Sequence, residues 1–232
     1  MKADISDLIE RFPMTRIAFL VSDSLKISEA RPEKLQARIM RTEAAVRDSF
    51  TRDDVGKIPG VRVWREAYKG FGVKKTSYRS SVERLLRKVL NDEPLPAINT
   101  LVDCYNRISI RHLMPVGADD LAMIDGDIGF RFARQTDSFI PLGQTDEDPP
   151  KPGEVVYADQ SKVLCRRWNW YQDTRSPVST STTRAVLTIQ SLGAGDLEMA
   201  ASDLARDLET FCGATTAVAI ADKDNPEVSF RL

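Results

Sequence analysis

Hydrophobic and polar positions follow helical spacing in some segments of the chain and extended spacing in others. The clearest helical pattern lies in residues 82–89, where apolar side chains recur every three or four positions and share one helix face. Before it, Ser80 and Glu83 have the spacing of a capping box, in which the serine oxygen accepts a backbone N–H and the glutamate reaches back. We therefore predict a helix here that ends near Asn91. Its apolar face consists of Val82, Leu85, Leu86 and Val89.

Other segments also carry helix signals. Pro32 suits the first turn of a helix, which we extend to about Phe50. Asn99 is a good N-cap for a helix that runs to about His112. A short helix over residues 3–12 would be stopped by Pro13, because the residue before proline avoids the helical region. We also predict helices over residues 60–69 and 196–211.

After Pro115 the pattern becomes extended. Asp125-Gly126 indicates a tight hairpin turn, and Asp159-Gln160-Ser161 a second one. Helices and strands mix without regular alternation, which favours an α+β fold with mixed sheets and flanking helices. The predicted strands cover residues 17–21, 129–133, 155–158, 162–168 and 183–190, with a final strand at 215–221.

Length and composition indicate an ordinary soluble globular protein, with one large domain or one domain with an added lobe. The chain has 232 residues, of which 42% are hydrophobic and 29% charged. No apolar run approaches the roughly 20 residues that span a bilayer, and the N-terminal segment lacks the features of a signal peptide. The three cysteines, Cys104, Cys165 and Cys212, are too few and too widely spaced for a disulfide framework. We therefore expect a cytoplasmic protein.

Charge is unevenly distributed along the chain. Residues 61–111 contain eleven Lys and Arg against five Asp and Glu, whereas residues 192–232 contain three against eight. A basic segment can bind a phosphate backbone, but helices with solvated charged faces give the same composition, and charge alone favours the second interpretation. The candidate phosphate contacts are Lys74, Lys75, Arg79, Arg84, Arg87 and Lys88.

Several kinds of site find little support in the sequence. The lone histidine, His112, has no nucleophile motif to serve, and we expect it to end a helix. The cysteines form no C-x-x-C pair, and nucleotide-binding glycine motifs are absent, so we predict no metal and no cofactor. An acidic group could in principle hold Mg²⁺, but we interpret it as a hairpin turn and a loop cap. It consists of Asp119, Asp120, Asp125 and Asp127.

The run Arg166-Arg167-Trp168-Asn169-Trp170-Tyr171-Gln172 combines basic and aromatic residues. Aromatic rings in such a run can stack on splayed RNA bases. The same alternation suits a strand with one buried aromatic face, which the pattern alone favours.

Residues 75–106, together with MPVGADD, GEVVYAD and CRRWNW further on, resemble a known family. It is the editing (B-three/B-four) domain of the bacterial phenylalanyl-tRNA synthetase β-subunit, particularly its free-standing homologues. The resemblance covers roughly residues 61–213, which would form the core of a single domain, with residues 1–60 as an N-terminal extension of helix and strand. It implies an editing-domain fold that hydrolyses the ester between a wrong amino acid and tRNA.

The resemblance also implies site residues. The family motif VVD-x-x-N stands here as residues 101–106 and places the pocket asparagine at Asn106. The motif P-L-H-A-F-D stands as residues 115–120 and puts Gly117 in place of the histidine. The glutamate that recognises the tyrosine hydroxyl falls on Gln190. We therefore expect Asn106 and Gln190 to be catalytic. The expected substrate-binding residues are Asn99, Thr100, Tyr105, Gly117, Trp168 and Asn169.

These two replacements change the expected specificity. Without the histidine and the glutamate, tyrosine selectivity does not carry over, and Gly117 predicts a wider pocket that suits small or aliphatic aminoacyl groups. Hydrolysis stays chemically feasible, because an aminoacyl ester is activated and an amide can orient water. The chain is too short, and lacks the ATP site, to be a complete aminoacyl-tRNA ligase. We thus predict a deacylase that edits mischarged tRNA in trans; the alternatives are a non-catalytic tRNA- or amino-acid-binding module and a small-molecule hydrolase.

Overall fold

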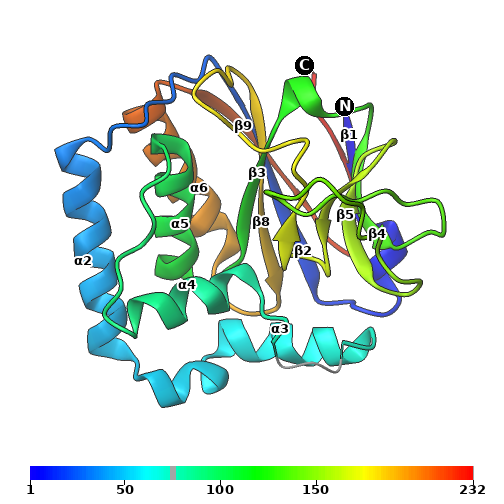
Figure 1. Cartoon of the computed structure of the whole chain (residues 1–232), viewed down its shortest axis with the longest axis horizontal. Helices are drawn as coiled ribbons and strands as arrows, with labels where there is room; N and C mark the ends of the chain where they lie inside the picture. Colours follow the sequence, from blue (N-terminus) through cyan, green and yellow to red (C-terminus); the bar gives the residue numbers. More distant parts are fainter. Residues whose placement is uncertain (74–76, 232) are drawn as a thin grey trace.

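A four-stranded sheet lies in the middle of the molecule, between a layer of helices and a six-stranded sheet (Figure 1). The computed structural model describes residues 1–73 and 77–231. The central sheet has the order β3 (Val116–Asp120), β8 (Ala185–Leu192), β2 (Thr15–Asp23) and β9 (Thr215–Ala221), all antiparallel. The larger sheet has the order β10 (Glu227–Ser229), β1 (Lys2–Asp4), β4 (Ile128–Phe132), β5 (Val155–Ala158), β6 (Val163–Arg166) and β7 (Tyr171–Gln172).

The larger sheet is mixed, because β1 runs parallel to β4 and antiparallel to β10. Helices α5 and α6 pack against the central sheet, and α2 lies outside α5 (Figure 1). This arrangement confirms the α+β class with mixed sheets and flanking helices. The helices are α1 (Ser6–Ile9), α2 (Glu33–Ser49), α3 (Pro59–Gly70), α4 (Ser81–Val89), α5 (Thr100–His112) and α6 (Leu197–Cys212), with short 3₁₀ turns η1 (Arg52–Lys57) and η2 (Leu121–Met123).

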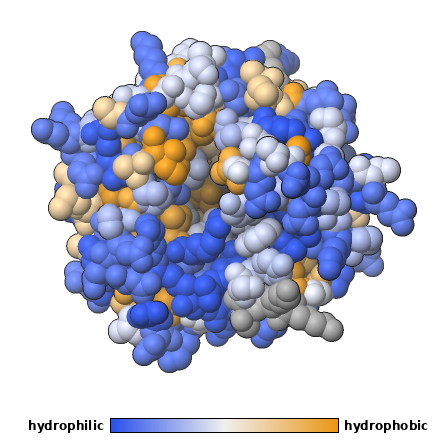
Figure 2. Space-filling view, viewed as in Figure 1, coloured by the Kyte–Doolittle hydropathy of each residue, from blue (hydrophilic) through white to orange (hydrophobic). Residues whose placement is uncertain are grey.

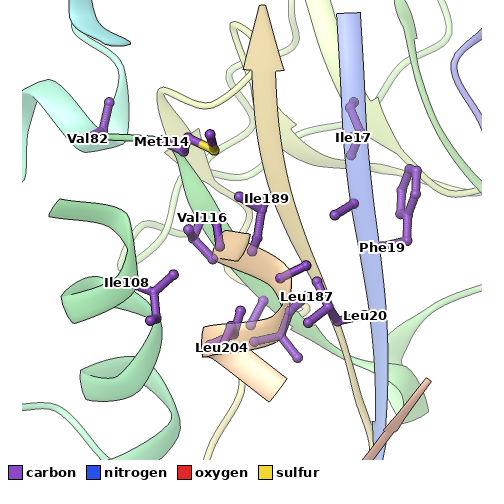
Figure 3. Close-up of a cluster of buried hydrophobic side chains, with 14 of the residues drawn as sticks. Ile17, Phe19, Leu20, Val82, Ile108, Met114, Val116, Leu187, Ile189 and Leu204 are labelled. Atoms are coloured by element: carbon purple, nitrogen blue, oxygen red, sulfur yellow. The ribbon is translucent and has the colours of Figure 1, made fainter. Parts of the chain in front are cut away.

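Each face of the central sheet packs against a different layer. Figure 3 shows Ile108 of α5 and Leu204 of α6 pointing toward Leu187 on one face. On the opposite face, Phe19 lies 6.2 Å from Phe130 of β4, measured between ring centroids. Successive side chains of a strand alternate between these faces. Every other residue of a central strand therefore faces the helices, and the residues between them face the six-stranded sheet, called the second sheet below.

Helix α5 follows its sequence signals closely. The Asn99 side-chain oxygen accepts the Val102 backbone N–H at 2.9 Å, and the helix ends at His112 as predicted. The hairpin of β5 and β6 around Asp159 is also confirmed. These elements could therefore be predicted from local cap and turn signals in the sequence.

The capping box before α4 is only half formed. Ser80 accepts the Glu83 backbone N–H at 3.4 Å, but the Glu83 carboxylate does not reach back. It is 1% exposed and instead accepts from Arg65 at 2.6 and 2.9 Å and from Arg87 at 2.9 Å. A buried carboxylate needs cationic partners more than it needs a backbone N–H, which explains the difference.

Other predictions near the chain ends were wrong. The helix predicted over residues 3–12 is strand β1 followed by the single turn α1, because Ala3 and Ile5 are buried within the fold. The strand predicted over residues 215–221 is present as β9, but it is not the last one, because β10 follows it and pairs with β1. The turn at Gly126 exists, but β4 pairs with β1 and β5, so the predicted hairpin there does not form. Among the described residues, no helix is long and apolar enough to cross a membrane.

Candidate functional site

A cavity of about 280 Å³ lies where α4, α5, β3 and β8 meet the second sheet. These elements come together at the centre of Figure 1, and Figure 2 shows a hollow in this part of the surface, with hydrophobic residues on one side of it. Its size is near the lower end for small-molecule pockets, so it suits a group no larger than an amino acid.

The register of β3 and β8 determines the polar wall of the cavity. Gly117 lies directly opposite Thr188, so both face the second sheet. Asp119 and Gln190 are each two residues further along their strands and therefore lie on the same face. All four residues line the cavity.

A chain of buried hydrogen bonds holds part of this wall. The Tyr68 hydroxyl donates to Asn169 Oδ1 at 2.8 Å, and Asn169 Nδ2 donates to Gln190 Oε1 at 2.9 Å. Gln190 Nε2 then donates to the Thr188 hydroxyl at 3.1 Å. Both amides are thereby fixed in orientation, which keeps the wall rigid.

Helix α5 contributes Tyr105 and Asn106 to the opposite side. The Asn106 side chain is 7% exposed overall, and none of the described residues hydrogen-bonds to its amide. This amide is therefore available to a ligand or a water molecule. Gly117 leaves the facing wall open, because a Cβ there would meet nothing within 4 Å.

The structure brings together five of the eight residues predicted for catalysis and substrate binding: Tyr105, Asn106, Gly117, Asn169 and Gln190 all line the cavity. The other three do not line it. Asn99 caps α5, and the buried Thr100 hydroxyl accepts the Ser28 backbone N–H at 3.1 Å. Trp168 is fully buried, with its ring 5.0 Å from Phe12 and 5.2 Å from Trp64.

The run from Arg166 to Gln172 is not one continuous strand, because a turn around Trp168 separates β6 from β7. Arg167 and Trp168 have φ values of 48° and 67°, in the left-handed region, so the chain turns here and the predicted strand ends at Arg166. Trp170 and Tyr171 line the cavity. The Arg167 guanidinium carbon lies 4.4 Å from the Trp170 ring centroid, which fixes that ring in place.

The predicted phosphate contacts differ in whether they line the cavity and whether they pair with a carboxylate. Arg84 and Lys88 line the cavity, and Arg84 is exposed to solvent. Arg79 and Arg87 lie 3.4 and 2.9 Å from the Glu83 carboxylate, which neutralises part of their charge. Lys74 and Lys75 lie outside the described residues.

A larger groove, of about 610 Å³, lies between α2, α5 and α6. Its arginines are largely paired: Arg107 with Asp207 at 2.5 Å, and Arg111 with Asp203 at 3.2 Å. None of the residues predicted for the site lines it. We therefore place the candidate site in the smaller cavity.

Asp119 is the main residue that sequence reasoning missed. Its segment was predicted to be a turn with Asp119 as a loop cap, whereas it is strand β3 and the side chain is 4% exposed. The two-residue spacing from Gly117 would have placed Asp119 in the pocket if the segment had been recognised as a strand.

Burial raises the pKa of Asp119 to about 7 by removing the carboxylate from water. Hydrogen bonds from the Ser176 hydroxyl at 2.6 Å and from Gln172 Nε2 at 3.0 Å offset this only in part. No cation forms an ion pair with Asp119 among the described residues. The ionised carboxylate is therefore a destabilised group within the cavity wall.

We expect Asp119 to make folding less favourable as the pH rises. A carboxyl with a higher pKa in the folded chain than in the unfolded one holds its proton more tightly when folded, so stability falls between about pH 4 and 7 and then levels off. Asp119→Asn cannot titrate and should be more stable at pH 8 by roughly 2–4 kcal/mol. Urea unfolding at pH 5 and pH 8 measures this, with the exposed-loop variant Asp146→Asn as control. Equal pH dependence in Asp119→Asn and the parent protein would contradict the assignment.

Comparison with known proteins identifies the family of the chain. The β-subunit of phenylalanine–tRNA ligase from Chromobacterium violaceum is 36% identical over 98 residues, which cover 42% of this chain and 12% of that subunit. An N-terminal fragment of the phenylalanyl-tRNA synthetase β-subunit from Pyrococcus horikoshii is 13% identical with a TM-score of 0.47, covering 92% of this chain and 49% of the fragment. The sequence model of the B3/4 domain matches residues 63–205, well over half of the chain. The chain belongs to the B3/4 domain family.

Proposed function

We propose that the protein hydrolyses mischarged aminoacyl-tRNA, with the aminoacyl group held in the cavity beside α5. The observation that carries this proposal is the meeting of Asn106, Gly117, Asn169 and Gln190 in one cavity of amino-acid size. These residues come from four separate segments of the chain, and family membership had predicted them for one pocket. The chain spans only 12% of the ligase subunit that it matches, so the reaction is proposed for this domain alone.

Asn106 is the group best placed to act on the reacting ester. Its amide can hold a water molecule against the carbonyl carbon or donate to the oxyanion that forms, and either role lowers the barrier without a titrating side chain. Gln190 has a different role, because its amide already hydrogen-bonds to Asn169 through its oxygen and to Thr188 through its nitrogen. We assign Gln190 to positioning the wall and Asn106 to the chemistry.

The open wall at Gly117 favours a broad or aliphatic specificity. No side chain within 4 Å of the Gly117 Cβ position restricts the ligand, and the apolar residues Leu85 and Leu164 also line the cavity. An apolar pocket separates ligands that differ by one methylene by only about 1–3 kcal/mol, which is the limit that a second hydrolytic site overcomes.

A non-catalytic binding module is the second candidate. It is favoured by the engagement of Gln190 in the wall, because both ends of this predicted catalytic amide already hydrogen-bond to the protein. In that case the cavity would hold the aminoacyl end of tRNA, or a free amino acid, without hydrolysis.

Deacylation measurements separate these two functions. On one tRNA carrying tyrosyl, isoleucyl, valyl or alanyl groups, we expect hydrolysis of the aliphatic esters at least as fast as of the tyrosyl ester. Asn106→Ala should lower the rate by about 10²-fold, as loss of an oxyanion donor does elsewhere. The matched control is Asn91→Ala, at an exposed position after α4. Strict preference for the tyrosyl ester would overturn the specificity, and no activity on any ester would favour the binding module.

tRNA binding should depend on the basic residues at the cavity. Reversing Arg84 and Lys88 to Glu should weaken binding and flatten its salt dependence by roughly one slope unit per lost phosphate contact. Filter binding across a range of salt concentrations measures both quantities. Lys223→Glu, between β9 and β10, is the control for net charge. If affinity and slope were unchanged in the double variant, the tRNA would bind elsewhere.

A further inference from the structure

Three polar groups in the cavity wall are left incompletely satisfied by the protein itself: the Asp119 carboxylate, the Tyr157 hydroxyl and the Ser81 hydroxyl. Asp119 accepts two hydrogen bonds, both at Oδ1, and no described donor lies within hydrogen-bond distance of Oδ2. The Tyr157 hydroxyl has no partner at all among the described residues, although its side chain is 3% exposed. Both residues line the cavity. An unpaired buried hydroxyl such as that of Tyr157 costs stability, and Asp119 Oδ2 offers a free acceptor in the same wall, so together they point to a ligand.

The strand register places Asp119 near Tyr157. Gln172, which donates to Asp119 Oδ1 at 3.0 Å, lies opposite Cys165 of β6, and Cys165 lies opposite Tyr157 of β5. The negative charge of Asp119 is among the causes that raise the pKa values of Tyr105, Tyr157 and Cys165, all of which line the cavity. The Tyr157 ring is held by stacking on Phe130, with 4.6 Å between the ring centroids. The hydroxyl is therefore kept in place without a hydrogen bond of its own.

The chemistry of this pair selects a cation that donates hydrogen bonds. A carboxylate and a phenol oxygen can both accept hydrogen bonds. A primary ammonium group supplies three donors, together with the positive charge that no described residue provides as a partner for Asp119. We propose that Asp119 and Tyr157 bind the α-ammonium group of an aminoacyl ligand. This rests on the proposed function for the identity of the ligand. It would let the protein distinguish an aminoacyl ester from a neutral acyl ester by the one group that every aminoacyl ester shares.

Calorimetry with a matched pair of ligands tests this assignment without an ester or a tRNA. L-leucinamide and its desamino analogue 4-methylpentanamide differ only in the ammonium group. At pH 7.5, above the pKa of about 7 of Asp119, most of this carboxyl is ionised. We expect the protein at this pH to bind leucinamide at least about tenfold more tightly than 4-methylpentanamide. Asp119→Asn should reduce this ratio to about one while leaving the affinity for 4-methylpentanamide nearly unchanged. Tyr157→Phe should reduce the ratio by a few fold.

The control is Tyr78→Phe, which removes a hydroxyl from a tyrosine outside the cavity wall and should leave the ratio unchanged. Equal affinity of the parent protein for both amides, or binding of neither, would overturn the proposal, as would a ratio that survives Asp119→Asn. The result is independent of deacylation. Discrimination between the amides with no hydrolysis would support the ammonium site and count against the deacylase, whereas hydrolysis without discrimination would do the reverse.

Discussion

The pairing of β3 with β8 is the constraint on which the site depends. In the observed register Gly117 lies opposite Thr188, which puts Gly117, Asp119, Thr188 and Gln190 on the face that meets the second sheet. A shift of β8 by one residue would turn Thr188 and Gln190 toward the helix layer and bring Leu187 and Ile189 into the cavity. The apolar positions between them are buried against α5 and α6, so the hydrophobic effect fixes the register and, with it, the polar wall.

The cavity exists because the layers around this strand pair do not close completely. Aromatic packing of Phe19, Phe130 and Tyr157 holds the two sheets together on one side. On the other side Trp168 packs against Trp64 of α3, and the chain then turns to place Asn169 and Trp170 at the cavity. The opening at Gly117 remains between these two supports. A rigid frame around a small polar space is what a site that orients one ester bond requires.

Elements defined by local signals could be predicted from the sequence. The Asn99 cap fixed the start of α5, and with it the positions of Tyr105 and Asn106, while the turn at Asp159 fixed the hairpin of β5 and β6. The resemblance to the family named Asn169 and Gln190 as site residues, and both line the cavity. Elements that depend on distant partners were missed: β1 is a strand only because β4 and β10 flank it.

The same reason explains the errors within the site. Asp119 looks like a loop residue until β8, far along the chain, pairs with its segment and buries it. Thr100 and Trp168 belong to the right segments but point into the packing behind the wall, and side-chain direction depends on tertiary contacts that motif matching does not contain. The motifs therefore name segments that meet around one cavity, but they do not say which side chains reach it.

The central claim is that this cavity binds the aminoacyl end of tRNA. Its most direct test is a crystal structure of the protein with an adenosine that carries a non-hydrolysable 3′-aminoacylamide, here a leucyl group. We predict that the leucyl group occupies the cavity, with its carbonyl oxygen or a bridging water within hydrogen-bond distance of the Asn106 amide. Binding of the analogue in the groove between α2, α5 and α6, with the cavity empty, would contradict the account.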